Sequence, residues 1–274
     1  MKAVCLALLI IGFNSLLAQD FFIGYDTSAS SAVSKKDMTI ASDVWLTQIA
    51  SDVDLHPITK MYDDPAEMAQ DVADGKLDYI AASGFTFVKY FDLSLLQDGF
   101  TQGFLNGKEE KFVFVVRKES DIKSVADIST QKIAMQEDDS VIKLYLKDKI
   151  KKSDRVNIEL FKSRQRALLK LFFGKAEVAV STNRSFALAA ELNPQIGKKL
   201  KILEVTQLQA TPFGFLRKGA DESMKRTLLH SVKKVHETPK GKQLLTLYKA
   251  EIIVDSKLED LGQFQKLYNN NNKE

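Results

Sequence analysis

The sequence predicts an α/β protein in which two similar lobes are joined by two extended crossings. Short apolar runs alternate with helical patterns, and this alternation is typical of parallel sheets with helices on both faces. The order strand-helix-strand-helix-strand occurs twice, first over residues 20–90 and again from residue 131. Residues 75–83 and 174–181 are the closest echo, since each contains a glycine, a lysine, an acidic residue, an apolar run and a serine. A plan that occurs twice predicts two lobes of one kind.

The first copy contains three predicted strands and two predicted helices. Asp64, Pro65 and Glu67 are typical of a helix start, because aspartate caps the first turn and proline fits within it. Gly75 is expected to end that helix. The predicted elements are, in order, a strand over 21–25, a helix near 36–51, a strand over 56–62, the helix that begins at Asp64, and a buried strand over 77–82.

The second copy repeats this order. Ser163 is expected to cap a helix that runs to Phe173, and Gly174 is expected to end it. The predicted elements are a strand over 132–135, a helix over 140–149, a strand over 157–161, the helix that begins after Ser163, and a strand over 176–180.

The segments outside the copies predict the crossings and a helical end. Residues 100–105 and 111–117 flank an Asn106-Gly107 turn and predict a hairpin, and residues 200–206 and 211–217 look similar. Three helices are expected after that, with starts at Asp221, Thr238-Pro239 and Asp255, and residues 269–272 are expected to fray. We therefore assign residues 19–108 plus 209–274 to lobe 1 and residues 109–208 to lobe 2.

Composition is that of a soluble globular protein. The 274 residues are 45% hydrophobic and 27% charged, and 39 Lys and Arg against 36 Asp and Glu give a net charge of 39 − 36 = +3. These values exclude disordered, collagen-like and polytopic membrane classes. Basic and acidic residues are interspersed with no basic stripe, so no nucleic-acid partner is expected.

The first eighteen residues resemble a secretory signal peptide. Met1-Lys2 is a short positive start, residues 3–13 are apolar, and Ala18 is the expected cleavage site. A retained N-terminal anchor is the alternative. Cleavage would remove Cys5, the only cysteine, and leave no thiol, disulfide or cysteine-bound metal. We expect a monomeric periplasmic protein without a membrane anchor.

Several runs give the chain a family resemblance. They are residues 75–81, 112–118 leading into 124–128, 168–181, and Thr238-Pro239-Lys240-Gly241 before an apolar helix. Over residues 21–268 the chain resembles a type II periplasmic solute-binding protein, and more narrowly the phosphate/phosphite/phosphonate-binding family of ABC importers. The resemblance implies a two-lobed periplasmic-binding-protein clamp that holds a small polar or anionic solute for a membrane permease.

The expected ligand site lies where strands end and helices begin on the two facing lobes. In open parallel sheets ligands bind outside the carboxyl ends of the strands, and helix N-termini there offer unpaired N–H groups to anions. The candidate ligand-binding residues are Tyr25, Thr27, Ser28, Ser83, Gly84, Thr86, Glu137, Asp139, Ser140, Arg164, Ser181, Thr182, Asn183 and Arg184. No cofactor and no metal are expected.

Three positions depart from the family pattern. Asp138-Asp139-Ser140 stands where relatives have a Ser-Thr-Ser-like cradle, and two carboxylates there would repel phosphate. Arg164 replaces a histidine and Ser83 an aromatic residue. Arg164 and Arg184 suit a phosphoryl group or carboxylate, whereas Glu137 or Asp139 suits an ammonium. A phosphonate-like or zwitterionic solute follows as the hypothesis.

Each candidate also has a structural interpretation. The two arginines fit solvated ion pairs, the serines fit helix caps, and Tyr25 fits core packing. A sensory protein that signals to a histidine kinase or chemoreceptor is the alternative function. Ser140-Val141-Ile142-Lys143 matches the Ser-x-x-Lys pattern of penicillin-recognising enzymes, but the chain has neither the Ser-Asp-Asn nor the Lys-Thr-Gly motif that this chemistry requires. An enzyme is therefore not expected.

Overall fold

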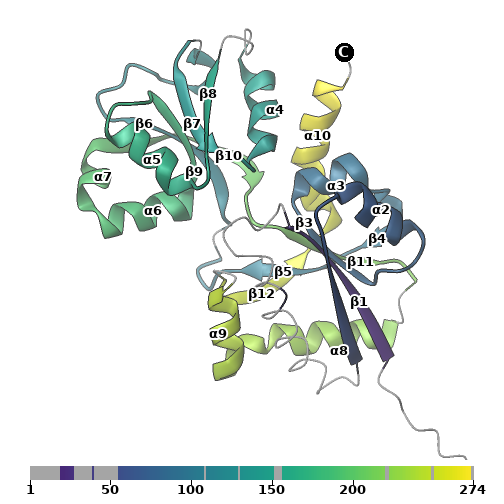
Figure 1. Cartoon of the computed structure of the whole chain (residues 1–274). Coiled ribbons are helices and arrows are strands. Elements are labelled where there is room, and N and C mark those ends of the chain that lie inside the picture. Colours follow the sequence, from purple (N-terminus) through teal and green to yellow (C-terminus); the bar gives the residue numbers. More distant parts are fainter. Residues whose placement is uncertain are drawn as a thin grey trace, which may run out of the picture.

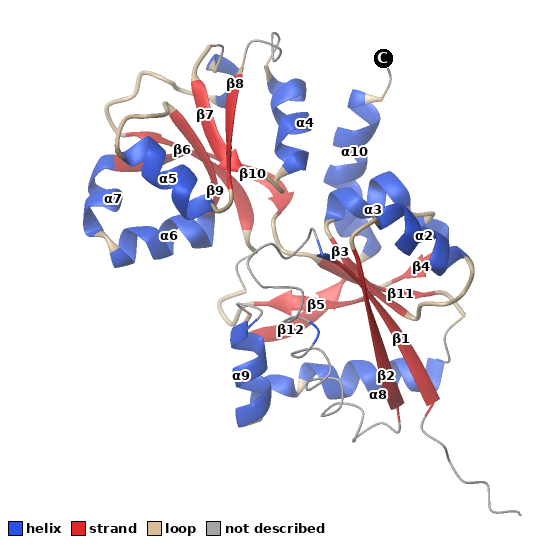
Figure 2. Ribbon diagram, in the orientation of Figure 1, coloured by secondary structure: helices blue, strands red, loops and turns tan. Residues whose placement is uncertain are grey.

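Two five-stranded sheets, each flanked by helices, form the protein (Figures 1 and 2). The computed structural model describes residues 19–27, 39, 55–107, 109–128, 130–150, 156–219, 222–247 and 250–272. The predicted signal peptide lies outside the described residues. So does the predicted helix near 36–51, except for Thr39, which is helical. None of the described helices is long and apolar enough to cross a membrane.

Lobe 1 is built on the sheet with strand order β2-β1-β3-β11-β4. Its strands are β1 (Gln19–Asp26), β2 (Leu55–Tyr62), β3 (Tyr79–Ala82), β4 (Leu96–Gln97) and β11 (Phe213–Arg217). A second, two-stranded sheet pairs β5 (Gly99–Gly103) with β12 (Ile252–Ser256). The helices of this lobe are α2 (Pro65–Ala73), α3 (Gly84–Tyr90), α8 (Glu222–Lys233), α9 (Pro239–Leu247) and α10 (Gly262–Asn271).

Lobe 2 has the strand order β8-β7-β9-β6-β10, which repeats the order of lobe 1. Its strands are β6 (Lys111–Arg117), β7 (Lys132–Gln136), β8 (Asn157–Phe161), β9 (Val178–Thr182) and β10 (Leu200–Gln209). Its helices are α4 (Ser140–Lys149), α5 (Arg164–Phe172), α6 (Asn183–Leu192) and α7 (Pro194–Lys199). In each lobe three parallel strands are followed by one strand that runs antiparallel to them, β11 or β6. The predicted two-lobed α/β architecture is confirmed.

The echoed glycine and acidic residue have the same role in both lobes. Gly75 and Gly174 end their helices with positive φ angles of 74° and 70°, a conformation that glycine adopts without strain. Asp78 accepts a hydrogen bond from the backbone N of Phe22, and Glu177 accepts one from that of Lys132. The acidic side chain before each third strand therefore bonds to the backbone of the neighbouring strand, within β1 in lobe 1 and at the first residue of β7 in lobe 2.

Two arginines, at the ends of β6 and β11, bond to equivalent turns, which directly precede β9 and β3. Arg217 donates from Nε to the carbonyl of Leu77 at 2.8 Å, and Arg117 donates from Nη1 to the carbonyl of Ala176 at 3.1 Å. These bonds satisfy buried carbonyls that the strand ladder leaves unpaired. The arginine that ends each crossing strand therefore makes the same kind of hydrogen bond in both lobes.

Helix α10 packs against both lobes, lying between α3 and α4 (Figure 1). Phe264 on α10 meets Phe213 edge to face at 5.7 Å, and Asn270 donates to Asp148 on α4 at 3.1 Å. One hydrophobic cluster consequently runs from α2 and α3 through α10 to α4 and the sheet of lobe 2. The lobes are joined by this helix as well as by their two crossings.

The two predicted hairpins are wrong. The turn at Asn106 exists, and Gly107 takes a φ of 64°, but β5 pairs with β12 while β6 pairs with β9 and β10. Likewise β10 stays in lobe 2 and β11 pairs with β3 and β4 in lobe 1. Each pair of segments is a crossing between lobes, because its two strands pair within different sheets.

The predicted end of the chain is also wrong in two respects. Asp255 lies inside β12 instead of starting a helix, and α10 begins at Gly262. Residues 269–271 belong to α10, where the sequence predicted a loose polar tail. Packing of α10 on both lobes stabilises a segment whose polar composition predicts a loose tail.

Candidate functional site

The lobe 1 part of the predicted site is a small hydrogen-bonded network at the ends of β1 and β3. Ser83 caps α3 by accepting from the backbone N of Thr86 at 3.0 Å. Thr86 in turn donates from Oγ1 to Asp26 at 2.8 Å. Asp26 is only 2% exposed, and sequence reasoning missed it, although its place directly after an apolar strand was a usable signal. The hydrogen bonds of Ser83 and Thr86 stay within lobe 1.

The other lobe 1 candidates have mainly structural contacts. Tyr25 is half-buried and packs against the core beneath α8 and α9. Thr27 donates to the carbonyl of Tyr62 at 3.1 Å and to Asp63 at 2.8 Å. A Cβ at Gly84 would lie 2.6 Å from Phe264, so glycine is required there by α10. Ser28 lies outside the described residues.

Asp139 and Arg164 form a two-bonded ion pair in lobe 2. Arg164 donates from Nε and Nη2 to the two carboxylate oxygens of Asp139, at 3.1 and 2.5 Å. The Asp139 side chain is 3% exposed and that of Arg164 24%. Burial raises the pKa of Asp139, and the Arg164 charge opposes this rise. The guanidinium also lies 5.4 Å from the Phe112 ring centroid.

This pair leaves the first turn of α4 without a side-chain cap. Asp139 occupies the N-cap position, but its carboxylate makes no hydrogen bond to the helix backbone. Ser140 and Glu137, at the same edge of the sheet, are both exposed. The start of α4 therefore combines free backbone N–H groups with an arginine whose Nη1 has no described partner.

The start of α6 is tied to the first crossing. Thr182 caps α6 by accepting from the backbone N of Ser185 at 3.0 Å, and it donates to Glu110. Asn183 accepts from the backbone N of Lys111 at 3.1 Å. Ser181 is fully buried, and its hydroxyl has no hydrogen-bond partner among the described residues. Glu110 is a second residue that sequence reasoning missed, because its partner is 72 positions away.

Arg184 connects the lobes. Its guanidinium carbon lies 3.5 Å from the ring centroid of Phe104, which follows β5. Its Nη2 lies 3.5 Å from Glu251, which precedes β12. The predicted residues thus form one group in each lobe, with Arg184 reaching from lobe 2 to lobe 1.

A pocket of about 120 Å³ lies beside these groups, where the crossings meet the two-stranded sheet. We call it the hinge pocket. None of the candidate residues that the structure describes lines it. Its lining residues are Thr101, Gln102, Gly103, Phe104, Gly107, Glu109, Glu110, Gln209, Thr211, Phe213, Val254, Asp255, Ser256 and Asp260.

The two α/β lobes and their crossings match the fold of solved two-lobed periplasmic binding proteins. The chain matches the model of the family described as "ABC transporter, phosphonate, periplasmic substrate-binding protein" over residues 28–261. It therefore belongs to this family, whose members bind small ligands in the periplasm and work with ABC transporter permeases. No curated protein sequence matches the chain significantly.

Solved structures agree with this fold at low sequence identity. PhnD1 from Prochlorococcus marinus in complex with methylphosphonate is 12% identical with a TM-score of 0.62, over 94% of this chain and 100% of that one. A protein from Xanthomonas citri bound to ATP is 13% identical with a TM-score of 0.63, over 91% and 95%. The aliphatic sulphonate binding protein SsuA from Escherichia coli is 12% identical with a TM-score of 0.56, over 92% of each chain.

Proposed function

We propose that this protein is the solute-binding component of an ABC importer and that it holds a small phosphonate-like or sulfonate-like oxyanion between its lobes. The family match over residues 28–261 carries this proposal, because it extends through both sheets and both crossings. Two relatives carry the names of ligands with the same tetrahedral oxyanion chemistry, methylphosphonate and aliphatic sulphonate. The match also favours transport over the sensory alternative.

The proposed clamp is a monomer that is exported by residues 1–18 and has no catalytic role. Lobe 1 comprises residues 19–108 and 209–274, and lobe 2 comprises residues 109–208. The first boundary lies before β6, and the second lies before the last residue of β10. Ligand stabilises a closed form by contacting both lobes at once. A membrane permease of an ABC transporter receives the solute.

Arg164 is the proposed oxyanion-binding group of lobe 2. Asp139 takes its Nε and Nη2, which leaves the Nη1 edge for a ligand oxygen. The first turn of α4 supplies backbone N–H groups and a partial positive charge beside it. Because Arg164 neutralises Asp139, the carboxylate at this position is compatible with an anionic solute.

Hydroxyl and amide groups complete the proposed site. Ser83 and Thr86 face the ligand from lobe 1, and Ser140, Thr182 and Asn183 from lobe 2. The remaining proposed contacts are Tyr25, Thr27, Ser28, Gly84, Glu137, Asp139, Ser181 and Arg184. The exposed Glu137 would meet the ammonium group of a zwitterionic solute, because both carboxylate oxygens of Asp139 are bonded to Arg164.

A thermal-shift screen of the protein without residues 1–18 tests this proposal. The panel contains methylphosphonate, phosphate, an alkylsulfonate, neutral amino acids and an alkylamine. A ligand at 100 times its Kd stabilises the native state by about 2.7 kcal/mol. For a chain of this size that corresponds to a rise in Tm of roughly 5–10 °C. We expect this rise with at least one oxyanion.

Arg164→Ala and Arg166→Ala form a matched pair for the same screen. Arg166 lies two positions further along α5 and is exposed, so its loss should leave the ligand-induced shift unchanged. Loss of Arg164 should abolish most of the shift. A panel in which only amino acids or amines raise Tm would overturn the proposed ligand class.

A further inference from the structure

Helices α5, α6 and α7 lie together at one side of lobe 2 and cover one face of its sheet (Figure 2). Leu168 of α5, Ala189 of α6 and Ile196 of α7 belong to one hydrophobic cluster with residues of β6 and β9. Helices α5 and α6 also contact each other. Since the sheet covers the inner sides of these two neighbouring helices, their outer sides face away from it.

The outer sides of α5 and α6 carry four large apolar side chains. Leu169 on α5 and Phe173 at its end are 40% and 66% exposed, and Leu188 and Leu192 on α6 are 49% and 71% exposed. Each pair is four positions apart, so its members are neighbours on the helix surface. Single exposed apolar residues are ordinary, whereas several on adjoining helices indicate an interaction surface. We call these four residues the outer apolar face.

The same part of the chain carries all of the surplus positive charge. Residues 162–199 contain eight basic and two acidic residues, so their formal net charge is 8 − 2 = +6, against +3 for the whole chain. The rest of the chain therefore totals 3 − 6 = −3. The basic residues are Lys162, Arg164, Arg166, Lys170, Lys175, Arg184, Lys198 and Lys199, and the acidic ones are Glu177 and Glu191.

Most of these cations have no partner of opposite charge. Three of the eight are ion-paired, and these are Arg164, Lys170 and Arg184. The other five are exposed, and none of them forms an ion pair with a described residue. Arg166 lies one turn before Leu169, and Lys175 lies two positions after Phe173. The outer apolar face is therefore bordered by unpaired positive charge.

This combination complements the surface of an anionic lipid bilayer. Peripheral surfaces of that kind place leucine and phenylalanine side chains at the boundary between headgroups and acyl chains. Their lysine and arginine side chains lie beside the anionic headgroups, which attract each of them. Both features are present on α5 and α6, in adjoining positions.

Two protein partners fit this surface less well. A second copy of the chain would bring two sets of unpaired cations together, and like charges repel. A permease that receives the solute docks beside the proposed ligand site, where α5 and α6 begin. Phe173 and Leu192 lie at the opposite ends of these helices, roughly 13 Å away at 1.5 Å per residue.

We propose that the outer apolar face of lobe 2, together with the cations that border it, binds the surface of an anionic lipid bilayer. The contact is peripheral and involves lobe 2 alone, so lobe 1 moves freely when solute binds. It holds the protein beside the bilayer that contains the proposed permease. It does not depend on the identity of the solute.

Co-sedimentation with lipid vesicles tests this surface in the protein without residues 1–18. One set of vesicles contains phosphatidylglycerol and phosphatidylcholine in equal parts, and the other contains phosphatidylcholine alone. Binding to the anionic vesicles should be saturable and should weaken as salt is added, because salt screens exposed charges. Binding to the neutral vesicles should be weaker by about tenfold or more.

Leu192→Ser and Leu105→Ser form a matched pair, because both side chains are 71% exposed. Leu192→Ser should weaken binding to the anionic vesicles about tenfold, because it removes apolar surface from the bilayer contact. Leu105 follows β5 in lobe 1, so Leu105→Ser should leave binding unchanged.

Lys175→Gln and Lys266→Gln form a second pair, since each removes one exposed cation. Lys175→Gln should weaken binding about fivefold, as the loss of one lysine near an anionic membrane does. Lys266 lies on α10, and Lys266→Gln should have no effect. Cooperative unfolding in urea should show that all four variants are folded.

Absence of saturable binding to the anionic vesicles would overturn the proposal. Binding that Leu192→Ser and Lys175→Gln change no more than their controls do would overturn it as well. A lipid-free dimer that Leu192→Ser dissociates would show that a second copy covers the outer apolar face, and this result would also contradict a bilayer contact.

Discussion

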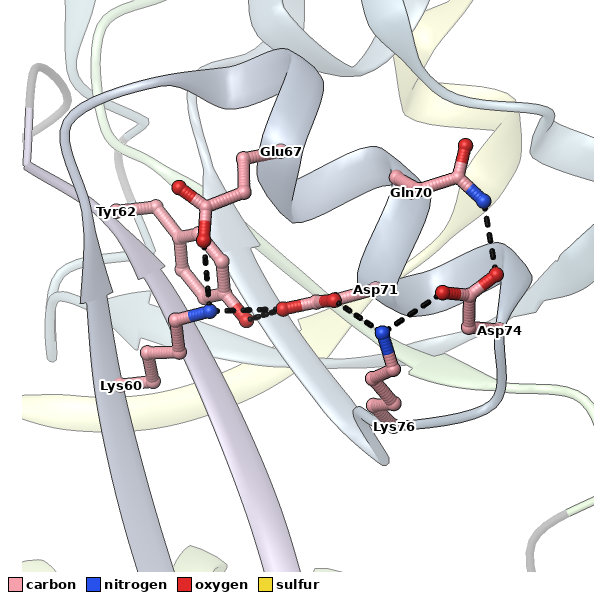
Figure 3. Close-up of polar contacts among 7 residues, drawn as sticks. All are labelled: Lys60, Tyr62, Glu67, Gln70, Asp71, Asp74 and Lys76. Carbon is pink, nitrogen blue, oxygen red and sulfur yellow. Dashed lines mark hydrogen bonds and ion pairs between the residues drawn. The ribbon is translucent and has the colours of Figure 1, made fainter.

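The two lobes share one backbone plan and differ in where they place opposite charges. An offset of 99 residues relates Lys60 and Asp71 in lobe 1 to Glu159 and Lys170 in lobe 2. Figure 3 shows Lys60 Nζ on β2 bonded to Asp71 on α2, at 2.9 Å. In lobe 2 the pair is reversed, with Lys170 on α5 3.4 Å from Glu159 on β8. Both lobes join strand and helix by an ion pair. The lysine lies on the strand in lobe 1 and on the helix in lobe 2.

An aromatic ring accompanies the lysine in each case. Lys60 lies 4.3 Å from the ring centroid of Tyr62, and Lys170 lies 5.3 Å from that of Phe161. Only the tyrosine adds a hydrogen bond, 2.7 Å from Oη to Asp71. The bonds from Lys60 and then Tyr62 hold the pKa of Asp71 well below its usual range. Lobe 1 therefore has the more extensive network at this corner.

The largest predicted effect on the free energy of unfolding is in β11, the strand that pairs with β3 in lobe 1 as β6 pairs with β9 in lobe 2. Gly214 on β11 lies opposite Ala81, whereas Phe114 on β6 lies opposite Val180. A Cβ at Gly214 would overlap Tyr79 Oη and the carbonyl of Phe100, because β5 crosses only the lobe 1 sheet. Gly214→Ala should cost about 3 kcal/mol or more in the free energy of unfolding, measured by urea denaturation.

Gly107→Ala is the control for this change. Gly107 has a φ of 64°, and a Cβ added there would meet no atom within 4 Å. Its substitution therefore costs only backbone strain, about 1 kcal/mol. A Gly214→Ala variant as stable as Gly107→Ala would show that β5 does not press on β11.

A charge exchange in the lobe 1 network should have an intermediate effect. Asp71→Lys removes the acceptor of Lys60, Tyr62 and Lys76 and should lower the free energy of unfolding by about 1–2 kcal/mol. Lys60→Glu added to Asp71→Lys recreates the polarity of lobe 2 and should recover part of that loss. A double variant no more stable than Asp71→Lys would contradict the equivalence of the two corners.

The pH dependence of the free energy of unfolding tests the role of Asp71 independently, through the variant Asp71→Asn. Because the folded pKa of Asp71 is below its ordinary value of 3.8, the native state binds fewer protons than the unfolded state in that range. The Asp71 contribution is then complete above about pH 4 and is lost as the pH falls through the folded pKa. The stability difference between the protein and Asp71→Asn should narrow below pH 3.8.

The smallest predicted effect is at the sheet edge. Ser181 corresponds to Ala82 at the 99-residue offset, and its buried hydroxyl has no described partner. Ser181→Ala should change the free energy of unfolding by less than about 0.5 kcal/mol, and any change should be stabilising. A clear loss of stability on chemical denaturation would mean that the hydroxyl is bonded within the ligand-free protein.

Sequence patterns predicted the elements whose causes are local. The helix starts at Asp64 and Ser163, the ends at Gly75 and Gly174, and the three strands of each copy along the chain are confirmed. Each depends on a cap, a positive φ or an alternation of apolar residues within a few positions. The family resemblance is likewise confirmed by the match over residues 28–261.

The features that sequence patterns did not predict depend on distant partners. Asn106-Gly107 forms a turn as expected, but long-range strand pairing decides that β5 and β6 separate. The pairing of Asp139 with Arg164 spans 25 residues, and that of Arg184 with Glu251 spans 67. Helix α10 is stabilised by contacts to two lobes, which no local property of its Asn-rich sequence indicates.

The most direct test of a ligand gripped from both lobes is calorimetric titration of methylphosphonate into two helix-cap variants. Ser83→Ala alters the start of α3 in lobe 1, and Thr182→Val alters the start of α6 in lobe 2. If both lobes hold the oxyanion, each variant should bind about tenfold more weakly while still unfolding cooperatively. Unchanged affinity in either folded variant would contradict a site shared between the lobes.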